Sequence, residues 1–284
     1  MILLHGRGSN AERFAYDQSI SCKPGILQCQ NSSAHTLPQV FPGMKFVFPT
    51  ALRRRSTARK RKATNIWFNN SSFEDPFERE GLQIDGLSDN FRILNEIVQN
   101  EARQLSLKHV FLGGISQGCA MALHVLLGLD GNMLDSDAGL GGFIGMSGWL
   151  PFQSAVNSLL LPAIIGDCME HDDDEENPFA TEIGDMVEEE EDLGSKVSRF
   201  IREDLMNLPC CKPDHQVFRK TPIFMGHGDQ DDIVELAHGK DAVSALNCLD
   251  LDVFWKVYEQ QGHWFGVPTT IDDMIAFLKK NMNP

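Results

Sequence analysis

The sequence predicts an α/β fold in which a mainly parallel sheet carries helices on both faces. Short apolar runs alternate with amphipathic segments through most of the 284 residues, as they do when parallel strands are joined by crossover helices. A hydrophobic fraction of 42% and a charged fraction of 23% are typical of a globular chain with one large core. No apolar run is long enough to span a bilayer, and the N-terminal MILLHGRGSN lacks the basic and apolar regions of a secretory signal.

Six short apolar segments are expected to be strands and four other segments to be helices. The clearest helix is predicted over 84–105, where apolar residues recur at helical spacing: Leu87, Phe91, Leu94, Val98 and Leu105. The expected strands are residues 1–4, 44–49, 109–113, 142–146, 222–226 and 253–258, and the other expected helices are residues 117–127, 234–246 and 271–281.

The formal net charge of −15 comes almost entirely from one segment. Thirteen acidic residues and no Lys or Arg lie between Glu170 and Asp192, so the rest of the chain is nearly neutral. This segment has no apolar period, and we expect a disordered insertion at about 167–195 within a single domain spanning 1–284. Seven basic residues lie between Arg53 and Lys62, and we interpret them as a solvated loop, with a nuclear-localisation or nucleic-acid patch as the alternative.

The cysteines and acidic residues do not form a recognisable metal site. The seven cysteines include no C-x-x-C pair, so we expect reduced thiols and a cytoplasmic location, with a nuclear one as the second option. His227 and Asp229 lack a third ligand at metal spacing, and the acidic segment lacks a calcium-loop pattern. No metal or organic cofactor is therefore expected.

The strongest chemical signal is G-x-S-x-G at Gly114-Ile115-Ser116-Gln117-Gly118, directly after a predicted strand and before a predicted helix. This is the setting of a nucleophile elbow, in which the glycines allow a sharp turn that lifts the serine hydroxyl above the sheet edge. The helix N-terminus then supplies N–H groups and partial positive charge where an oxyanion forms. Ser147, in GMSG, is a rival serine that lacks the second glycine, and we interpret it as structural.

The partners of a catalytic triad follow in the order serine, acid, histidine. Asp229 and Asp231 follow the predicted strand 222–226, and spacing alone leaves both as candidates for the acid. His263 follows the strand 253–258 and precedes the last helix, where a base could take the serine proton. The turn HGRG after the first strand brings backbone N–H groups near the acyl oxygen, so we assign the oxyanion hole to the amides of Arg7 and Gln117.

Five ordered motifs, LHGRGSN, GGISQG, GMSGWLP, HGDQDDIV and GHWF, resemble the phospholipase/carboxylesterase family of α/β-hydrolases, in particular its fungal acyl-protein thioesterases. The resemblance covers nearly the whole chain except the acidic segment. It implies an α/β-hydrolase fold with Ser116 as nucleophile, His263 as base and Asp231 as the acid. It also implies an acyl-binding surface at Trp67-Phe68 and at Trp149-Leu150.

The resemblance implies a serine hydrolase that cleaves acyl thioesters or esters through an acyl-serine, with acylated proteins as substrates. A lysophospholipase or short-chain carboxylesterase with the same triad is the alternative, and a non-catalytic binding protein on this fold is a further one. We expect no nucleic-acid partner, at most peripheral membrane contact, and a monomer or weak dimer.

Overall fold

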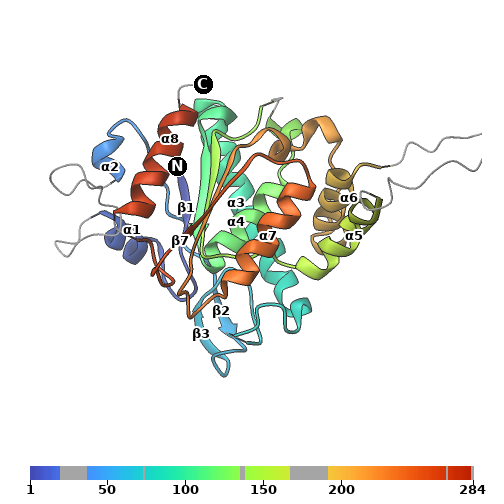
Figure 1. Ribbon diagram of the computed structural model, residues 1–284, viewed down its shortest axis with the longest axis horizontal. Helices are drawn as coiled ribbons and strands as arrows, with labels where there is room; N and C mark the ends of the chain where they lie inside the picture. Colours follow the sequence, from blue (N-terminus) through green and yellow to red (C-terminus); the bar gives the residue numbers. More distant parts are fainter. Residues whose placement is uncertain (20–36, 73, 135–137, 167–190, 267, 283–284) are drawn as a thin grey trace, which may run out of the picture.

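The computed structural model describes residues 1–19, 37–72, 74–134, 138–166, 191–266 and 268–282. Its centre is a five-stranded sheet in the order β1-β4-β5-β6-β7, and every neighbouring pair of strands is parallel (Figure 1). The strands are β1 (Ile2–Leu4), β4 (Phe111–Ile115), β5 (Gly142–Met146), β6 (Ile223–Gly228) and β7 (Val253–Tyr258). The predicted mainly parallel sheet is confirmed.

Helices cover both faces of the sheet, as predicted (Figure 1). One face packs against α1 (Ala11–Ser19), α2 (Leu37–Val40) and α8 (Thr269–Met282), which share a cluster of buried side chains with that face. On the other face, α4 (Gln117–Gly128) and α7 (Leu236–Cys248) pack on the strands. Three further helices pack on these two: α3 (Ile84–Leu105) and α6 (Leu193–Arg199) on α4, and α5 (Gln153–Gly166) on α7. Among the residues described, no helix is both long and apolar enough to cross a membrane.

Helix α3 has the predicted bounds because its apolar stripe faces the core. Leu87, Phe91, Leu94 and Val98 are all buried, whereas Leu105, at its last turn, is half exposed. Helix α4 differs from α3 because all twelve of its residues are buried and apolar side chains occur all round it. It lies between the sheet and α3, and it carries the turn that follows β4.

Residues 44–49 are not the predicted strand. Only Val47 pairs with the sheet, through a parallel bridge to Ile2 in which Leu3 N–H donates to Val47 O at 3.0 Å and Val47 N–H donates to Met1 O at 2.8 Å. Phe46 and Phe48 pack against the α1/α8 cluster. The apolar side chains that suggested a strand are therefore satisfied by packing, without a continuous ladder.

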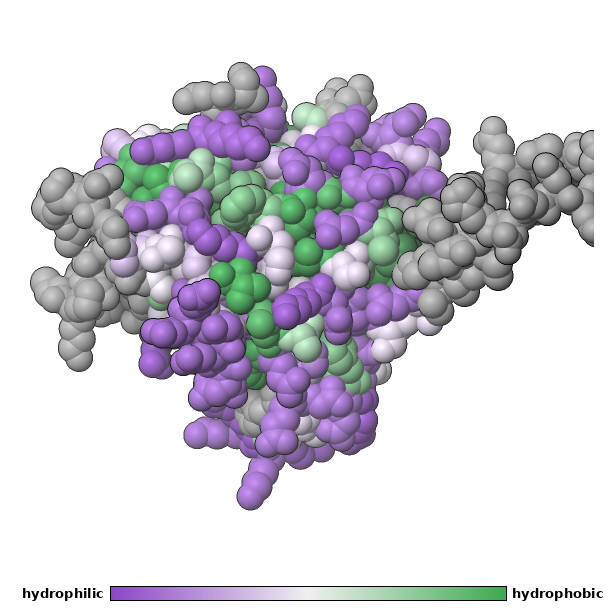
Figure 2. All heavy atoms as spheres, viewed as in Figure 1, coloured by the Kyte–Doolittle hydropathy of each residue, from purple (hydrophilic) through white to green (hydrophobic). Residues whose placement is uncertain are grey.

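The predicted solvated loop at 53–62 is mostly exposed, but it belongs to a hairpin, with residues 53–56 in a strand and residues 57–61 in the turn. Strand β2 (Arg53–Ser56) pairs antiparallel with β3 (Lys62–Asn65), with Arg53 opposite Asn65. Figure 2 shows that hydrophilic residues cover the lower part of the molecule, where Figure 1 places β2 and β3. The packed face of β2 carries the polar residues Arg54 and Ser56, so no apolar alternation marks a strand here.

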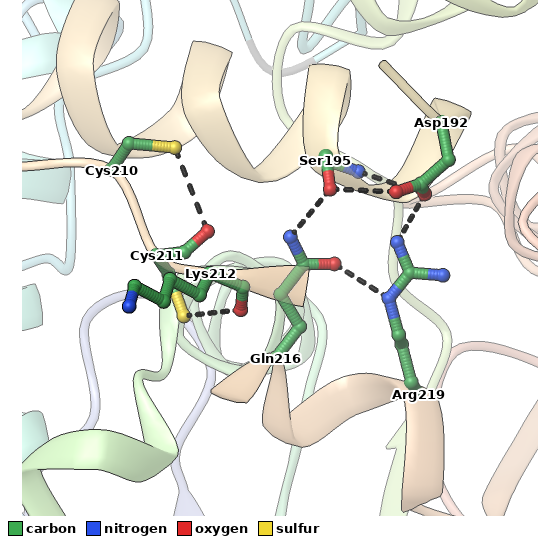
Figure 3. Close-up of polar contacts among 7 residues, drawn as sticks. All are labelled: Asp192, Ser195, Cys210, Cys211, Lys212, Gln216 and Arg219. Atoms are coloured by element: carbon green, nitrogen blue, oxygen red, sulfur yellow. Dashed lines mark hydrogen bonds and ion pairs between the residues drawn. The ribbon is translucent and has the colours of Figure 1, made fainter. Parts of the chain in front are cut away.

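Most of the predicted acidic insertion lies outside the described residues, but its end is structured. Helix α6 begins at Leu193, and the side chain of Asp192 caps it by accepting a hydrogen bond from Ser195 N–H at 3.2 Å. In Figure 3, Ser195 and Gln216 link this cap to Arg219, which also forms an ion pair with Asp192. The structured part therefore begins before residue 195, the predicted boundary.

The described cysteines Cys119, Cys210, Cys211 and Cys248 are free thiols. In Figure 3, Cys210 Sγ contacts the carbonyl of Cys211, and Cys211 Sγ contacts the carbonyl of Lys212. Burial raises the pKa of Cys211 to about 12, with the nearby Asp130 carboxylate adding to the effect. These four cysteines agree with the expected reduced thiols, and Cys211 is a poor nucleophile.

A buried histidine in α4 predicts acid sensitivity. His124 faces the ring of Phe91, and burial lowers its pKa from 6.5 to about 3. The unfolded chain thus binds one more proton than the folded chain between these values, so the free energy of unfolding falls as pH drops below about 6.5. We expect the urea midpoint to decrease from pH 7 to pH 5, and to decrease less in His124→Leu. The same pH dependence in both proteins would contradict this.

Candidate active site

Ser116 occupies a sharp turn between β4 and α4. Its backbone φ of 57° and ψ of −130° is a conformation that non-glycine residues rarely adopt. A Cβ on Gly114 would lie 2.5 Å from the Gly118 carbonyl carbon, and one on Gly118 would lie 2.4 Å from Leu4 O. Both positions therefore require glycine, and the predicted strand, turn and helix surround Ser116.

Gln117, the first residue of α4, lies directly beside Ser116. Because Ser116 is the N-cap residue of α4, the first backbone amides of the helix, including that of Gln117, lie next to the serine. The Ser116 side chain makes no cap hydrogen bond. The buried Gln117 side chain accepts a hydrogen bond from Trp67 N–H at 3.1 Å and donates to Phe68 O at 2.8 Å. Gln117 thus holds the chain at 67–70 against α4, a role that the sequence did not indicate.

The structure joins His263 to Asp231. His263 Nδ1 lies 2.9 Å and 2.8 Å from the two carboxylate oxygens of Asp231, whose side chain has no exposed surface. Oδ1 of Asp231 also accepts hydrogen bonds from the amides of Ile233 and Val234, both at 2.9 Å. Asp229, the other candidate acid, is exposed. The geometry therefore favours Asp231 over Asp229.

The electrostatics keep Asp231 ionised. Burial alone raises the pKa of this carboxyl, but hydrogen bonds from His227, His263 and the Val234 amide outweigh burial and hold the pKa far below its ordinary value. A carboxylate in this state can orient an imidazole and stabilise its protonated form.

A second histidine contacts Asp231, and nothing in the sequence indicated this contact. His227 is buried, and its Nε2 lies 3.2 Å from Asp231 Oδ2 and 2.9 Å from Val234 O. Both neighbours are acceptors, so Nε2 carries the proton and donates. A Cβ on Gly239 would lie 2.5 Å from His227 Nδ1, which shows how tightly α7 encloses the ring. His227 therefore holds the acid loop in place.

Close contact between two loops aligns Asp231 with His263. A Cβ on Gly228 would lie 2.1 Å from Gln261 O, so the end of β6 can approach the loop after β7 only with glycine at this position. Gln230 N–H donates to Gln261 O at 3.0 Å, and Asp229 N–H donates to Tyr258 O at 3.0 Å. These backbone bonds fix the two loops in register at the carboxyl ends of neighbouring parallel strands.

Ser116 and His263 line one cavity of about 500 Å³. No hydrogen bond links their side chains in the part of the chain that the structure describes, and such contacts often tighten only when substrate is bound. Arg7, the other proposed oxyanion donor, lines the same cavity. No group of His, Cys, Asp and Glu residues in the described ranges is arranged to hold a metal ion.

The four residues expected at the acyl-binding surface are all buried, and they lie in different places. Trp149 lines the cavity. Trp67, Phe68 and Leu150 belong to the core cluster beneath it. Trp67 Nε1 donates to His5 O at 2.7 Å, and the Phe68 ring meets Trp149 edge-on at 6.1 Å. These contacts make Phe68 a support for the Trp149 wall.

A family model described as phospholipase/carboxylesterase matches residues 1–175, more than half of the chain. The chain belongs to the phospholipase/carboxylesterase family. A second model, described as the prolyl oligopeptidase family, matches residues 165–284. Membership of the phospholipase/carboxylesterase family confirms the predicted α/β-hydrolase fold and the prediction that the chain is a serine hydrolase.

Several relatives of this phospholipase/carboxylesterase family member are named acyl-protein thioesterase. Acyl-protein thioesterase 1 of Kluyveromyces lactis is 23% identical over 285 residues, which cover 99% of this chain and 90% of the relative. Acyl-protein thioesterase 1 of Saccharomyces cerevisiae is 23% identical over 249 residues, or 87% and 82% of the two chains. The crystal structure of Zea mays acyl-protein thioesterase 2 is similar with a TM-score of 0.62 at 19% identity, covering 99% of this chain and 93% of that one.

Proposed function

We propose that the protein hydrolyses acyl thioesters and esters through an acyl-serine intermediate, with acylated proteins as substrates. The observation that carries the proposal is that His263, hydrogen-bonded to the buried carboxylate of Asp231, lines one cavity with Ser116 on the elbow. Ser116 is the nucleophile, His263 the base, and Asp231 the carboxylate that orients the base. The amides of Gln117 and Arg7 form the oxyanion hole.

The proton positions follow from the hydrogen bonds. Asp231 is ionised and accepts the Nδ1–H proton of His263, so Nε2 of His263 is the free base. Nε2 takes the hydroxyl proton as Ser116 Oγ attacks the acyl carbon, and the same proton passes to the departing thiol or alcohol. Water then attacks the acyl-serine, His263 accepts its proton, and transfer of that proton to Ser116 Oγ releases the carboxylic acid.

The walls of the cavity support an acyl substrate. Pro76, Trp149, Ile233 and Val234 form an apolar part of its lining. We infer that an acyl chain lies along this part, with Trp67, Phe68 and Leu150 holding the wall from beneath. The relatives named acyl-protein thioesterase favour acylated proteins, and the family description favours lysophospholipids or simple esters as the alternative. We further propose action in the cytoplasm as a monomer or weak dimer.

The proposal is tested with an S-palmitoylated peptide and the matching O-palmitoylated serine peptide. We expect release of palmitate from both, faster from the thioester, and labelling of the wild-type protein by a fluorophosphonate probe. Hydrolysis of the oxygen ester alone would point to the esterase alternative. A folded protein that neither reacts with the probe nor cleaves either peptide would contradict the proposal.

A further inference from the structure

The active-site cavity has a basic wall that hydrolysis of a neutral ester does not require. Arg7, Arg13 and Arg59 line it together with Ser116 and His263. Among the described residues that line the cavity, Glu74 is the one with a carboxylate, and Glu74 is exposed. Pro76, Trp149, Ile233 and Val234 also line the cavity. The cavity around Ser116 therefore has both a basic and an apolar part in its wall.

Two separate parts of the chain bring the arginines together. Arg7 follows β1 and Arg13 lies in the first turns of α1, whereas Arg59 belongs to the turn between β2 and β3. Gly8 N–H donates to Asn65 O at 2.8 Å, and Asn65 Nδ2 donates to Ser9 O at 3.1 Å. These bonds tie the basic hairpin, the hydrophilic lower part of Figure 2, to the edge of the cavity.

The guanidinium groups of Arg7 and Arg59 are close enough to influence one another. A Cβ on Gly8 would lie 3.7 Å and 3.8 Å from the two terminal nitrogens of Arg59, so this side chain lies over the loop that contains Arg7. Burial and the charge of Arg59 lower the pKa of Arg7 to about 10. The Arg7 guanidinium still carries its charge at neutral pH, and a negative charge placed between the two arginines would interact favourably with both.

We propose that the basic wall of the cavity binds an anionic group, a carboxylate or a phosphate, that the substrate carries close to its scissile acyl bond. The acyl chain then contacts the apolar lining while the anionic group meets Arg59 and Arg13. Arginine suits this task because its planar fork forms two parallel hydrogen bonds to a carboxylate or phosphate. This inference rests on the proposed function, because it names the substrate class of the same site.

Three pairs of small esters test the proposal, each pair a neutral ester and its charged analogue. The methyl and free-acid forms of p-nitrophenyl adipate place a carboxylate on the acyl side. The butyrate esters of 7-hydroxycoumarin and of 7-hydroxycoumarin-3-carboxylate place a carboxylate on the leaving group. Monobutyrylglycerol and monobutyrylglycerol 3-phosphate place a phosphate on the leaving group. The measured quantity is the ratio of kcat/KM for the charged ester to that for the neutral one.

We expect this ratio to fall about tenfold in Arg59→Gln and in Arg13→Gln for at least one pair, which then identifies the group and its side. Arg53→Gln is the matched control, because Arg53 is exposed on β2 of the same hairpin and does not belong to the cavity lining. Ratios that neither substitution changes in any pair, with the neutral esters still hydrolysed, would overturn the anion site alone. No hydrolysis of any ester and no fluorophosphonate labelling would overturn the proposed function with it.

Discussion

Ser116→Ala is expected to lower kcat for a p-nitrophenyl ester about a million-fold, the loss seen when the nucleophile is removed from a serine-protease triad. The reason is that Oγ forms the covalent bond, and no other described hydroxyl shares the strained turn at the start of α4. The fold should persist, because the Ser116 side chain makes no cap hydrogen bond that the substitution would remove. Initial rates and fluorophosphonate labelling both measure the effect.

Ser147→Ala is the matched control for this experiment. Ser147 is also buried, also follows a parallel strand, and has a φ of 47°, but it stands outside the G-x-S-x-G turn. Its Oγ has no hydrogen-bond partner among the described residues, so its loss should cost little stability. Activity that disappears in Ser147→Ala and survives in Ser116→Ala would reverse the assignment of the nucleophile.

Asp231→Asn is expected to lower kcat about ten-thousand-fold, as the equivalent change does in a serine protease. An asparagine amide can donate to His263 Nδ1, which favours the tautomer with the proton on Nε2, and this tautomer cannot accept the Ser116 proton. The neutral amide also fails to stabilise the imidazolium. Steady-state kinetics at pH 8 measure the loss.

Asp229→Asn separates the two acids. Asp229 is exposed on the same loop and its amide bonds Tyr258 O, so changing its side chain should leave kcat within about twofold of wild type. A large loss in Asp229→Asn together with a small one in Asp231→Asn would refute the geometric assignment. Since the pKa of Asp231 lies far below its ordinary value, Asp231 does not set the acid limb of the pH–rate profile.

The parts of the fold that the sequence predicted are those in which packing imposes a period. Helix α3 and strands β5 and β7 have the predicted bounds because their side-chain patterns match helical or extended burial. The β2–β3 hairpin was missed because the packed face of β2 carries polar residues, Arg54 and Ser56, which leave no apolar period. Helix α5 was missed because Pro162 stands within its apolar run and is typical of a helix break.

The sequence predicts the parts of the candidate site whose geometry is set by a local motif. It does not predict the contacts that form between segments far apart in the chain. The turn at Ser116 follows from Gly114 and Gly118, whose positions no Cβ could occupy. The contact of His227 with Asp231 depends on how the loop after β6 folds back, and the sequence alone does not specify this. The basic wall was hidden for the same reason, since Arg7 and Arg59 are far apart in the chain.

The complete burial of α4 has a consequence for how the enzyme can move. A helix with no exposed residue exchanges its amide hydrogens chiefly through unfolding of the whole molecule, whereas the loops around the cavity can open locally. The proposed nucleophile therefore stands at the end of one of the most rigid elements, and the cavity walls can adjust around it. Differences in acyl groups should be accommodated by those walls, while the position of the attacking oxygen stays constant.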